Sequence, residues 1–93
     1  MSQDDWVQIW ITIENKLGLH ARPAMSFVDI ANTFASEVRV LKGEQEVDGK
    51  SIMQMMMLAA VQGTKLEVKA LGDDADEALA AIESLVERKF DEE

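Results

Sequence analysis

The chain has 93 residues, of which 47% are hydrophobic, and its 18 acidic and 9 basic residues give a formal net charge of −9. This length suits one domain with a single core, and the negative charge, which repels a phosphate backbone, argues against nucleic acid as a partner. Cysteine is absent, which excludes disulfides and thiolate metal sites, and no apolar run is long enough for a signal peptide or a membrane span. We expect one domain over residues 1–93, with a flexible tail at 1–5, in a soluble cytoplasmic protein that does not insert into a membrane.

The first predicted element is a strand over residues 6–13. Apolar residues at 7, 9, 11 and 13 alternate with Trp6, Gln8, Trp10 and Thr12, which is the period of a half-buried strand. The two tryptophans favour a partly covered second face over an aromatic ligand platform. A connection over 14–19 follows, in which Gly18 permits backbone angles that other residues resist.

A helix is predicted directly after His20, the only histidine of the chain. One apolar stripe with helical spacing consists of Ala24, Phe27, Val28, Ala31 and Phe34. Pro23 fits the first turn, where its missing N–H would have no intrahelical partner. His20 is therefore expected at a helix N-terminus.

The rest of the chain alternates short strands and helices. Strands at 37–41 and 45–48 flank a turn and form a hairpin, and a further strand covers 65–70. Ser51 and Gln54 form a capping box that opens a short helix ending near Ala60. Asp73 or Asp74 caps the last helix, whose stripe is Ala75, Ala78, Leu79, Ile82, Leu85 and Val86, with Phe90 closing it. The order indicates an α+β domain whose helices cover one face of an antiparallel sheet.

Chemistry-bearing residues gather around His20. Histidine can act as a nucleophile, the N–H groups of a helix N-terminus bind phosphate, and Arg22 offers a planar fork for phosphoryl oxygens. A covalent phosphohistidine follows as a hypothesis; the alternative is a surface histidine beside a solvated cation. Without a second histidine, a cysteine or an acid pair, a metal site or hydrolytic triad has little support.

Two motifs resemble one known family. Leu-Gly-Leu-His-Ala-Arg-Pro-Ala at 17–24 is similar to the active-centre motif of HPr, the histidine-containing phosphocarrier family of the bacterial phosphoenolpyruvate-dependent phosphotransferase system. Asp-Gly-Lys-Ser-Ile-Met at 48–53 resembles the family's regulatory serine region, and the similarity runs from about Ile9 to the last helix.

The resemblance implies an open-faced β-sandwich, with a four-stranded antiparallel sheet and three helices on one face. His20 would accept a phosphoryl group on Nδ1 from the first enzyme of the system and pass it to a downstream permease or regulatory domain. Arg22 and the backbone of Gly18, Ala21 and Arg22 would bind the phosphoryl oxygens. The chain would then be a carrier and not an enzyme, a monomer by default, with no cofactor and no metal.

The resemblance also implies that an HPr kinase/phosphorylase modifies Ser51 in hosts that have one. We expect the docking surface on the methionine-rich helix, with Ile52, Met53 and Met56 near that surface and the other apolar residues of the helix inward. The family usually has basic residues on its first helix where this chain has Asp29 and Asn32. Two alternatives remain: a regulatory binding protein switched by Ser51, or a carrier of the nitrogen-related branch.

Overall fold

The computed structural model describes residues 5–92, so the expected flexible tail falls almost entirely outside the described residues. Its elements follow the order β1 (Val7–Thr12), α1 (Ala21–Ala31), β2 (Glu37–Lys42), β3 (Gln45–Asp48), α2 (Ile52–Met57), β4 (Lys65–Leu71) and α3 (Ala75–Glu87), with a short 3₁₀ turn at Lys89–Asp91. None of the helices in this part of the chain is long and apolar enough to cross a membrane.

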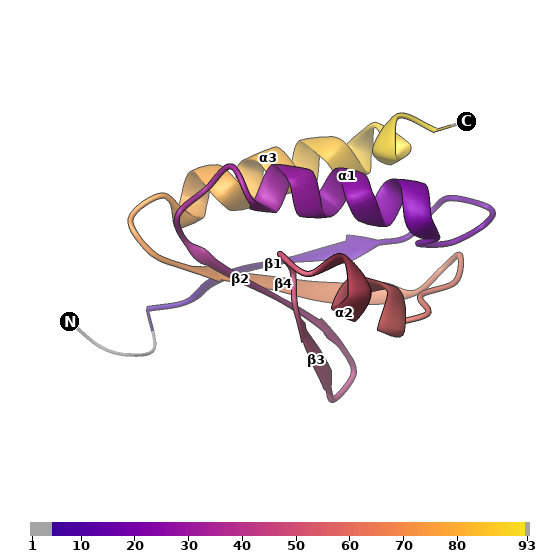
Figure 1. Cartoon of the computed structure of the whole chain (residues 1–93), viewed down its shortest axis with the longest axis horizontal. Coiled ribbons are helices and arrows are strands. Elements are labelled where there is room, and N and C mark those ends of the chain that lie inside the picture. Colours follow the sequence, from indigo (N-terminus) through magenta and orange to yellow (C-terminus); the bar gives the residue numbers. More distant parts are fainter. Residues whose placement is uncertain (1–4, 93) are drawn as a thin grey trace.

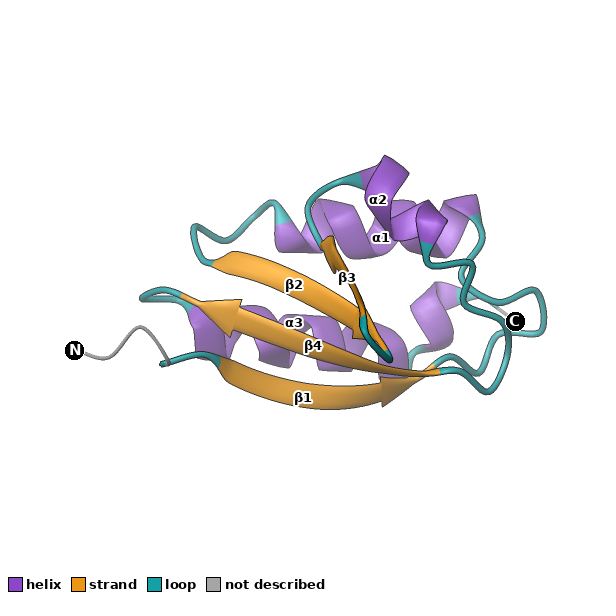
Figure 2. Cartoon of the chain, turned by 90° about the horizontal axis from the view of Figure 1, so that it is seen from below, coloured by secondary structure: helices purple, strands orange, loops and turns teal. Residues whose placement is uncertain are grey.

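The strands form one antiparallel sheet in the order β1-β4-β2-β3. Helices α1 and α3 lie side by side over one face of this sheet, and α2 lies against α1 and β3 (Figure 1). Figure 2 looks onto the opposite face, where no helix intervenes. The predicted α+β fold, an open-faced sandwich with a four-stranded antiparallel sheet, is confirmed.

The core forms between this sheet face and the two long helices. All of the predicted stripe of α3 is buried or half-buried, and in α1 the buried residues are Pro23, Ala24, Phe27, Val28 and Ala31. Phe34 lies beyond the end of α1 and is only half-buried. The helix ends earlier than the apolar pattern because Asn32 caps it, donating from Nδ2 to the carbonyl of Val28 at 3.0 Å.

The outer sheet face is more open than the sequence analysis predicts. Trp10 is 65% exposed, whereas Trp6 is half-buried with the ammonium group of Lys69 5.0 Å from its ring centroid. The expectation of a partly covered face is therefore wrong at Trp10, because no helix of the described residues packs on that side.

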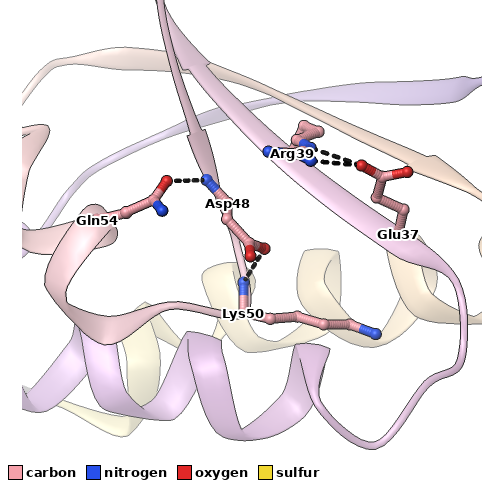
Figure 3. A network of polar contacts seen from close by, with 5 residues as sticks. All are labelled: Glu37, Arg39, Asp48, Lys50 and Gln54. Carbon is pink, nitrogen blue, oxygen red and sulfur yellow. Dashed lines mark hydrogen bonds and ion pairs between the residues drawn. The ribbon is translucent and has the colours of Figure 1, made fainter.

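Both predicted helix caps differ from expectation in their hydrogen bonds. Ser51 is the N-cap of α2 and its Oγ accepts from the N–H of Gln54 at 3.2 Å, but Oε1 of Gln54 accepts from the N–H of Asp48 at 2.9 Å. Figure 3 shows this second contact, which joins α2 to the end of β3. The capping box is thus half-formed, since the glutamine stabilises the strand exit instead of returning to Ser51.

Asp74 occupies the N-cap position of α3 without capping it. Its carboxylate accepts from the backbone N–H groups of Ala35 and Ser36, at 2.8 and 2.9 Å, and from the Ser36 hydroxyl. The Ser36 hydroxyl, followed by the Ala35 N–H, lowers the pKa of Asp74 below its ordinary value. The carboxylate therefore ties the α1–β2 connection to the start of α3.

Candidate functional site

His20 lies where the chain enters α1. It is the N-cap residue, with extended backbone angles (φ −79°, ψ −170°), and its carbonyl accepts the first intrahelical bond from the N–H of Ala24 at 3.0 Å. Its side chain makes no capping hydrogen bond. The predicted position at a helix N-terminus is confirmed, and the imidazole is not used to build the helix.

The loop before His20 rests on the connection between α2 and β4. The N–H of Leu19 donates to the carbonyl of Ala60 at 2.8 Å, and Gly18, at φ +72°, lies so close that a Cβ there would be 2.5 Å from the same oxygen. The N–H of Gly18 donates to the carbonyl of Asn15 at 2.9 Å. This N–H is thus engaged within the loop, and Gly18 permits close packing there; phosphate binding by the Gly18 backbone stays a prediction.

The imidazole of His20 faces the C-terminal segment. Its side chain is 36% exposed, but Nε2 is buried and lies 3.0 Å from Oε2 of Glu92. The two atoms are at the distance of an ion pair, but Nε2 makes no hydrogen bond to the residues that the structure describes. The exposed part of the side chain is therefore the rest of the ring.

Asn15 holds Glu92 in this place. Its Nδ2 donates to Oε1 of Glu92 at 2.7 Å and to the carbonyl of Lys89 at 2.9 Å. Neither Asn15 nor Glu92 is among the site residues predicted from the sequence. No local pattern could reveal a contact between residues 77 apart in the chain, although the concentration of acids at the C-terminus is visible in the sequence.

An open depression beside His20 contains both cations and acids. Its volume is about 300 Å³, and Lys16, Leu17, Arg22, Asp91 and Glu92 line it. The N–H groups of Ala21 and Arg22, in the first turn of α1, have no acceptor within the helix. Arg22 and these two N–H groups thus face the same end of α1, where an anion would gain from them.

A second depression on the other side of His20 is apolar. Its volume is also about 300 Å³, and the residues that line it are Leu17, Leu19, His20, Met56, Ala59, Ala60 and Val61. Met53 and Met56 are exposed as expected, and Ile52 is half-buried against the core. Met55 and Leu58 are buried as expected, but Met57, which the sequence analysis places inward, is 66% exposed.

Ser51 lies at the opposite end of α2 from Met57. Next to it, Lys50 is fixed by a bond from Nζ to the carbonyl of Phe34 at 2.7 Å, and its backbone N–H donates to the Asp48 carboxylate at 2.9 Å (Figure 3). Asn32 donates to the Lys50 carbonyl at 3.3 Å. The structure therefore places Ser51 at the start of α2, whereas His20 lies beside the apolar depression that Met56 and Ala59 line near the end of this helix.

Comparisons with known proteins agree with this geometry. Residues 7–88 match the model of the family described as PTS HPr component phosphorylation site. The phosphocarrier protein HPr of Pseudomonas aeruginosa is 52% identical over 83 residues, which cover 88% of this chain and 92% of that protein. The phosphocarrier protein NPr of Proteus mirabilis is 43% identical over 84 residues, covering 89% and 93%.

Solved structures give the same result. A crystal structure of HPr-C-His from Thermoanaerobacter tengcongensis has a TM-score of 0.90 and 46% identity, covering 94% of this chain and 98% of that one. A second structure of HPr from that organism, described as a dimer, has a TM-score of 0.74 and 48% identity, covering 86% and 92%. With its fold, its histidine at a helix N-terminus and these relatives in agreement, the chain belongs to the HPr family of phosphocarriers of the phosphotransferase system.

Proposed function

We propose that His20 is the residue that carries the phosphoryl group, and that it does so on Nδ1. The observation that carries this proposal is the placement of the imidazole. Its Nε2 is buried against Glu92, whereas the ring itself is at the N-terminus of α1 and one-third exposed (36%). A phosphoryl group on Nε2 would meet a carboxylate, so Nδ1 is the nitrogen with an approach.

Arg22 and two N–H groups bind the phosphoryl oxygens in this proposal. The guanidinium supplies a fixed positive charge, and the N–H groups of Ala21 and Arg22 supply donors at the positive end of the helix dipole. Phosphoryl transfer depends mainly on positioning and on charge stabilisation. This chain would supply the acceptor and its anion site, while a partner enzyme supplies the rest.

The partners are the first enzyme of the system, as donor, and downstream permease or regulatory domains, as acceptors. Met53 and Met56 belong to the partner surface. Leu17 and Val61, which are exposed at the apolar depression, and Met57, which is exposed on α2, extend it. Exposed methionines can adapt to several unrelated partners. Ile52 supports this surface from a half-buried position. We also propose that the protein is a monomer in the cytoplasm. Sedimentation at the concentration used in the transfer assay tests whether it is a monomer.

Incubation with phosphoenolpyruvate and the first enzyme tests the carrier proposal. The wild-type chain should gain one acid-labile phosphoryl group, and mass spectrometry after proteolysis should place it on His20. The His20→Ala variant should gain none, while Arg22→Ala should retain the site and lose rate. Phosphorylation that persists in His20→Ala, or none in the wild type with active enzyme, would refute the proposal.

Regulatory phosphorylation of Ser51 is a second candidate. Ser51 is half-buried at the N-cap of the helix that carries Met53 and Met56, so a phosphate there would put negative charge beside the partner surface. An HPr kinase with ATP should modify the wild type and not Ser51→Ala. The phosphorylated form should accept the phosphoryl group at His20 more slowly, and an unchanged rate would contradict a regulatory role.

Two alternative functions would use the same residues with different partner proteins. A chain that works mainly as a regulatory binding protein would keep its signalling in His20→Ala and lose it in Ser51→Ala. A carrier of the nitrogen-related branch, the branch of the NPr relatives, would transfer the phosphoryl group to regulatory domains and not to sugar permeases. Competition between both kinds of purified acceptor distinguishes the branches.

A further inference from the structure

The C-terminal segment makes a contact with His20 that lies outside the family match. The matched residues end at 88, whereas Glu92 reaches back to the imidazole and places Oε2 3.0 Å from Nε2. The Glu92 side chain is only 14% exposed. A carboxylate so far removed from water acts on its neighbour more strongly than one on the surface does.

The backbone after α3 is shaped to make this contact. Lys89, Phe90 and Asp91 all have positive φ, at 54°, 56° and 60°, although none of them is glycine. Such angles cost a non-glycine residue free energy and persist only where the surroundings impose them. The buried ring of Phe90 and the bond from Asn15 to the Lys89 carbonyl impose them here.

Asn15 fixes the carboxylate itself. Its Nδ2 donates to Oε1 of Glu92 at 2.7 Å, so Oε2 is left to face His20. Asn15 is buried and begins the loop that leads to His20. One side chain thus connects the loop before the histidine with the segment that faces its ring (the short turn after α3 and this loop lie at the same end of the molecule in Figure 1).

We propose that Glu92 is a positioning residue for phosphoryl transfer: its carboxylate, at ion-pair distance from Nε2 of His20, favours the tautomer with the proton on Nε2 and stabilises the positive charge that the ring gains when Nδ1 attacks phosphorus. This inference rests on the proposed role of His20. A neutral imidazole has one N–H and one lone pair, so a proton kept on Nε2 leaves the lone pair on Nδ1. Orientation of a histidine by a carboxylate at its other nitrogen is a general device in catalysis.

The step balances without any further reactant. The Nδ1 lone pair forms the N–P bond, and the bond from phosphorus to the donor atom of the first enzyme breaks, leaving its electron pair on that enzyme. The Nε2 proton stays on the ring, which is therefore cationic in the transition state. The Glu92 carboxylate lies beside this positive charge and stabilises it only during transfer. An interaction that is stronger in the transition state than in the ground state raises the rate.

Two variants of Glu92 and one control test this role in the full chain. Glu92→Ala removes the carboxylate, Glu92→Gln removes only its charge, and Glu87→Gln removes one charge from an exposed position on α3. The rate of phosphoryl acceptance by His20 should fall about tenfold in both Glu92 variants, because each removes the negative charge that faces the cationic ring in the transition state. The Glu87→Gln rate should equal that of the wild type.

The imidazole tautomer supplies the second readout, which a merely structural role would not move. The ¹⁵N shifts of His20 at alkaline pH should show the proton on Nε2 in the wild type and a mixture of tautomers in Glu92→Ala. Unchanged rate and tautomer in both Glu92 variants would overturn the inference, as would faster transfer, which would indicate that Glu92 blocks the anion site. A wild-type chain that accepts no phosphoryl group would instead refute the carrier proposal, and the tautomer would still report on the contact of Glu92 with His20.

Discussion

At the scale of single residues, the packing of the active loop depends on Gly18. Its positive φ costs any other L-residue about 1–2 kcal/mol, and a Cβ would lie 2.5 Å from the Ala60 carbonyl oxygen, a backbone atom that cannot move aside alone. Gly18→Ala should therefore lower the free energy of unfolding by about 2 kcal/mol or more. It should also slow phosphoryl acceptance, because the loop that carries His20 must shift.

Gly43 provides the matched control for this prediction. It too has a positive φ, +59°, but nothing lies within 4 Å of its missing Cβ. Gly43→Ala should show the backbone cost alone, without slower transfer. Urea denaturation of both variants separates the two contributions. Equal losses of stability and equal transfer rates would show that contact with Ala60 is unimportant.

The methionines of α2 give a second test at this scale. Met55 is fully buried and Met57 is 66% exposed, two residues further on the same short helix. Met55→Ala should cost about 2–5 kcal/mol, as removal of a core methionine does, whereas Met57→Ala should change stability by less than about 0.5 kcal/mol. Thermal and urea unfolding provide the measurement. A larger loss of stability in Met57→Ala than in Met55→Ala would instead support the inward position of Met57 that is predicted from the sequence.

At the scale of elements, Asp74 joins the start of α3 to the α1–β2 connection. The Ser36 hydroxyl and the N–H groups of Ala35 and Ser36 favour its charged form, so its pKa is lowered in the folded state. The resulting stabilisation is fully present above the ordinary pKa of about 3.8 and is lost as the pH falls through the lowered folded value. Asp74→Asn should therefore be less stable than the wild type at neutral pH, and the difference should shrink in acid.

Urea titrations at a series of pH values measure this difference. Asp73→Asn is the control, because it removes the same charge from the exposed neighbouring residue. It should leave the pH dependence of stability close to that of the wild type. A gap between wild type and Asp74→Asn that stays constant below about pH 3.8 would contradict the assigned role of the carboxylate.

Elements were predictable where a pattern was local. The alternation of β1 and the stripes of α1 and α3 depend on neighbours a few residues apart, and each of these elements is present close to its predicted bounds. The two differences are at helix ends: α1 ends before Phe34, and α3 ends at Glu87, so that Phe90 lies in the following 3₁₀ turn. The orientation of α2 is harder to predict, because five of its six residues are apolar and only Gln54 is polar. Such a helix has no polar face to show which side points outward, so Met57 was misplaced.

At the scale of the whole molecule, the part of the site that could not be predicted comes from tertiary contact. The motif around His20 identifies the acceptor and Arg22 because both lie within one turn of chain. Glu92 reaches the imidazole, and Asn15 reaches Glu92, only after α3 has crossed the sheet and the C-terminal turn has folded back. Periodicity carries no information about such a contact, so the sequence does not predict that Asp91 and Glu92 lie beside the loop of His20.

The excess of acidic side chains predicts how the whole domain responds to salt. A formal net charge of −9 on 93 residues destabilises the compact state by self-repulsion. The ion pairs that salt would weaken, Arg39 with Glu37 and Arg88 with Asp91, involve partly or fully exposed side chains and contribute little. Raising sodium chloride from about 10 mM to about 150 mM shortens the Debye length from about 30 Å to about 8 Å, so repulsion should weaken more than attraction.

The free energy of unfolding, measured by urea denaturation at constant pH, should therefore increase with salt over this range. A variant with fewer negative charges supplies the control, and exposed Asp76 and Glu77 on α3 can be replaced together by Asn and Gln. Its stability should respond less steeply to salt because less repulsion remains to be screened. A wild-type stability that falls with added salt would instead mean that specific ion pairs, with Glu92 and His20 the first to examine, outweigh the repulsion of the excess charge.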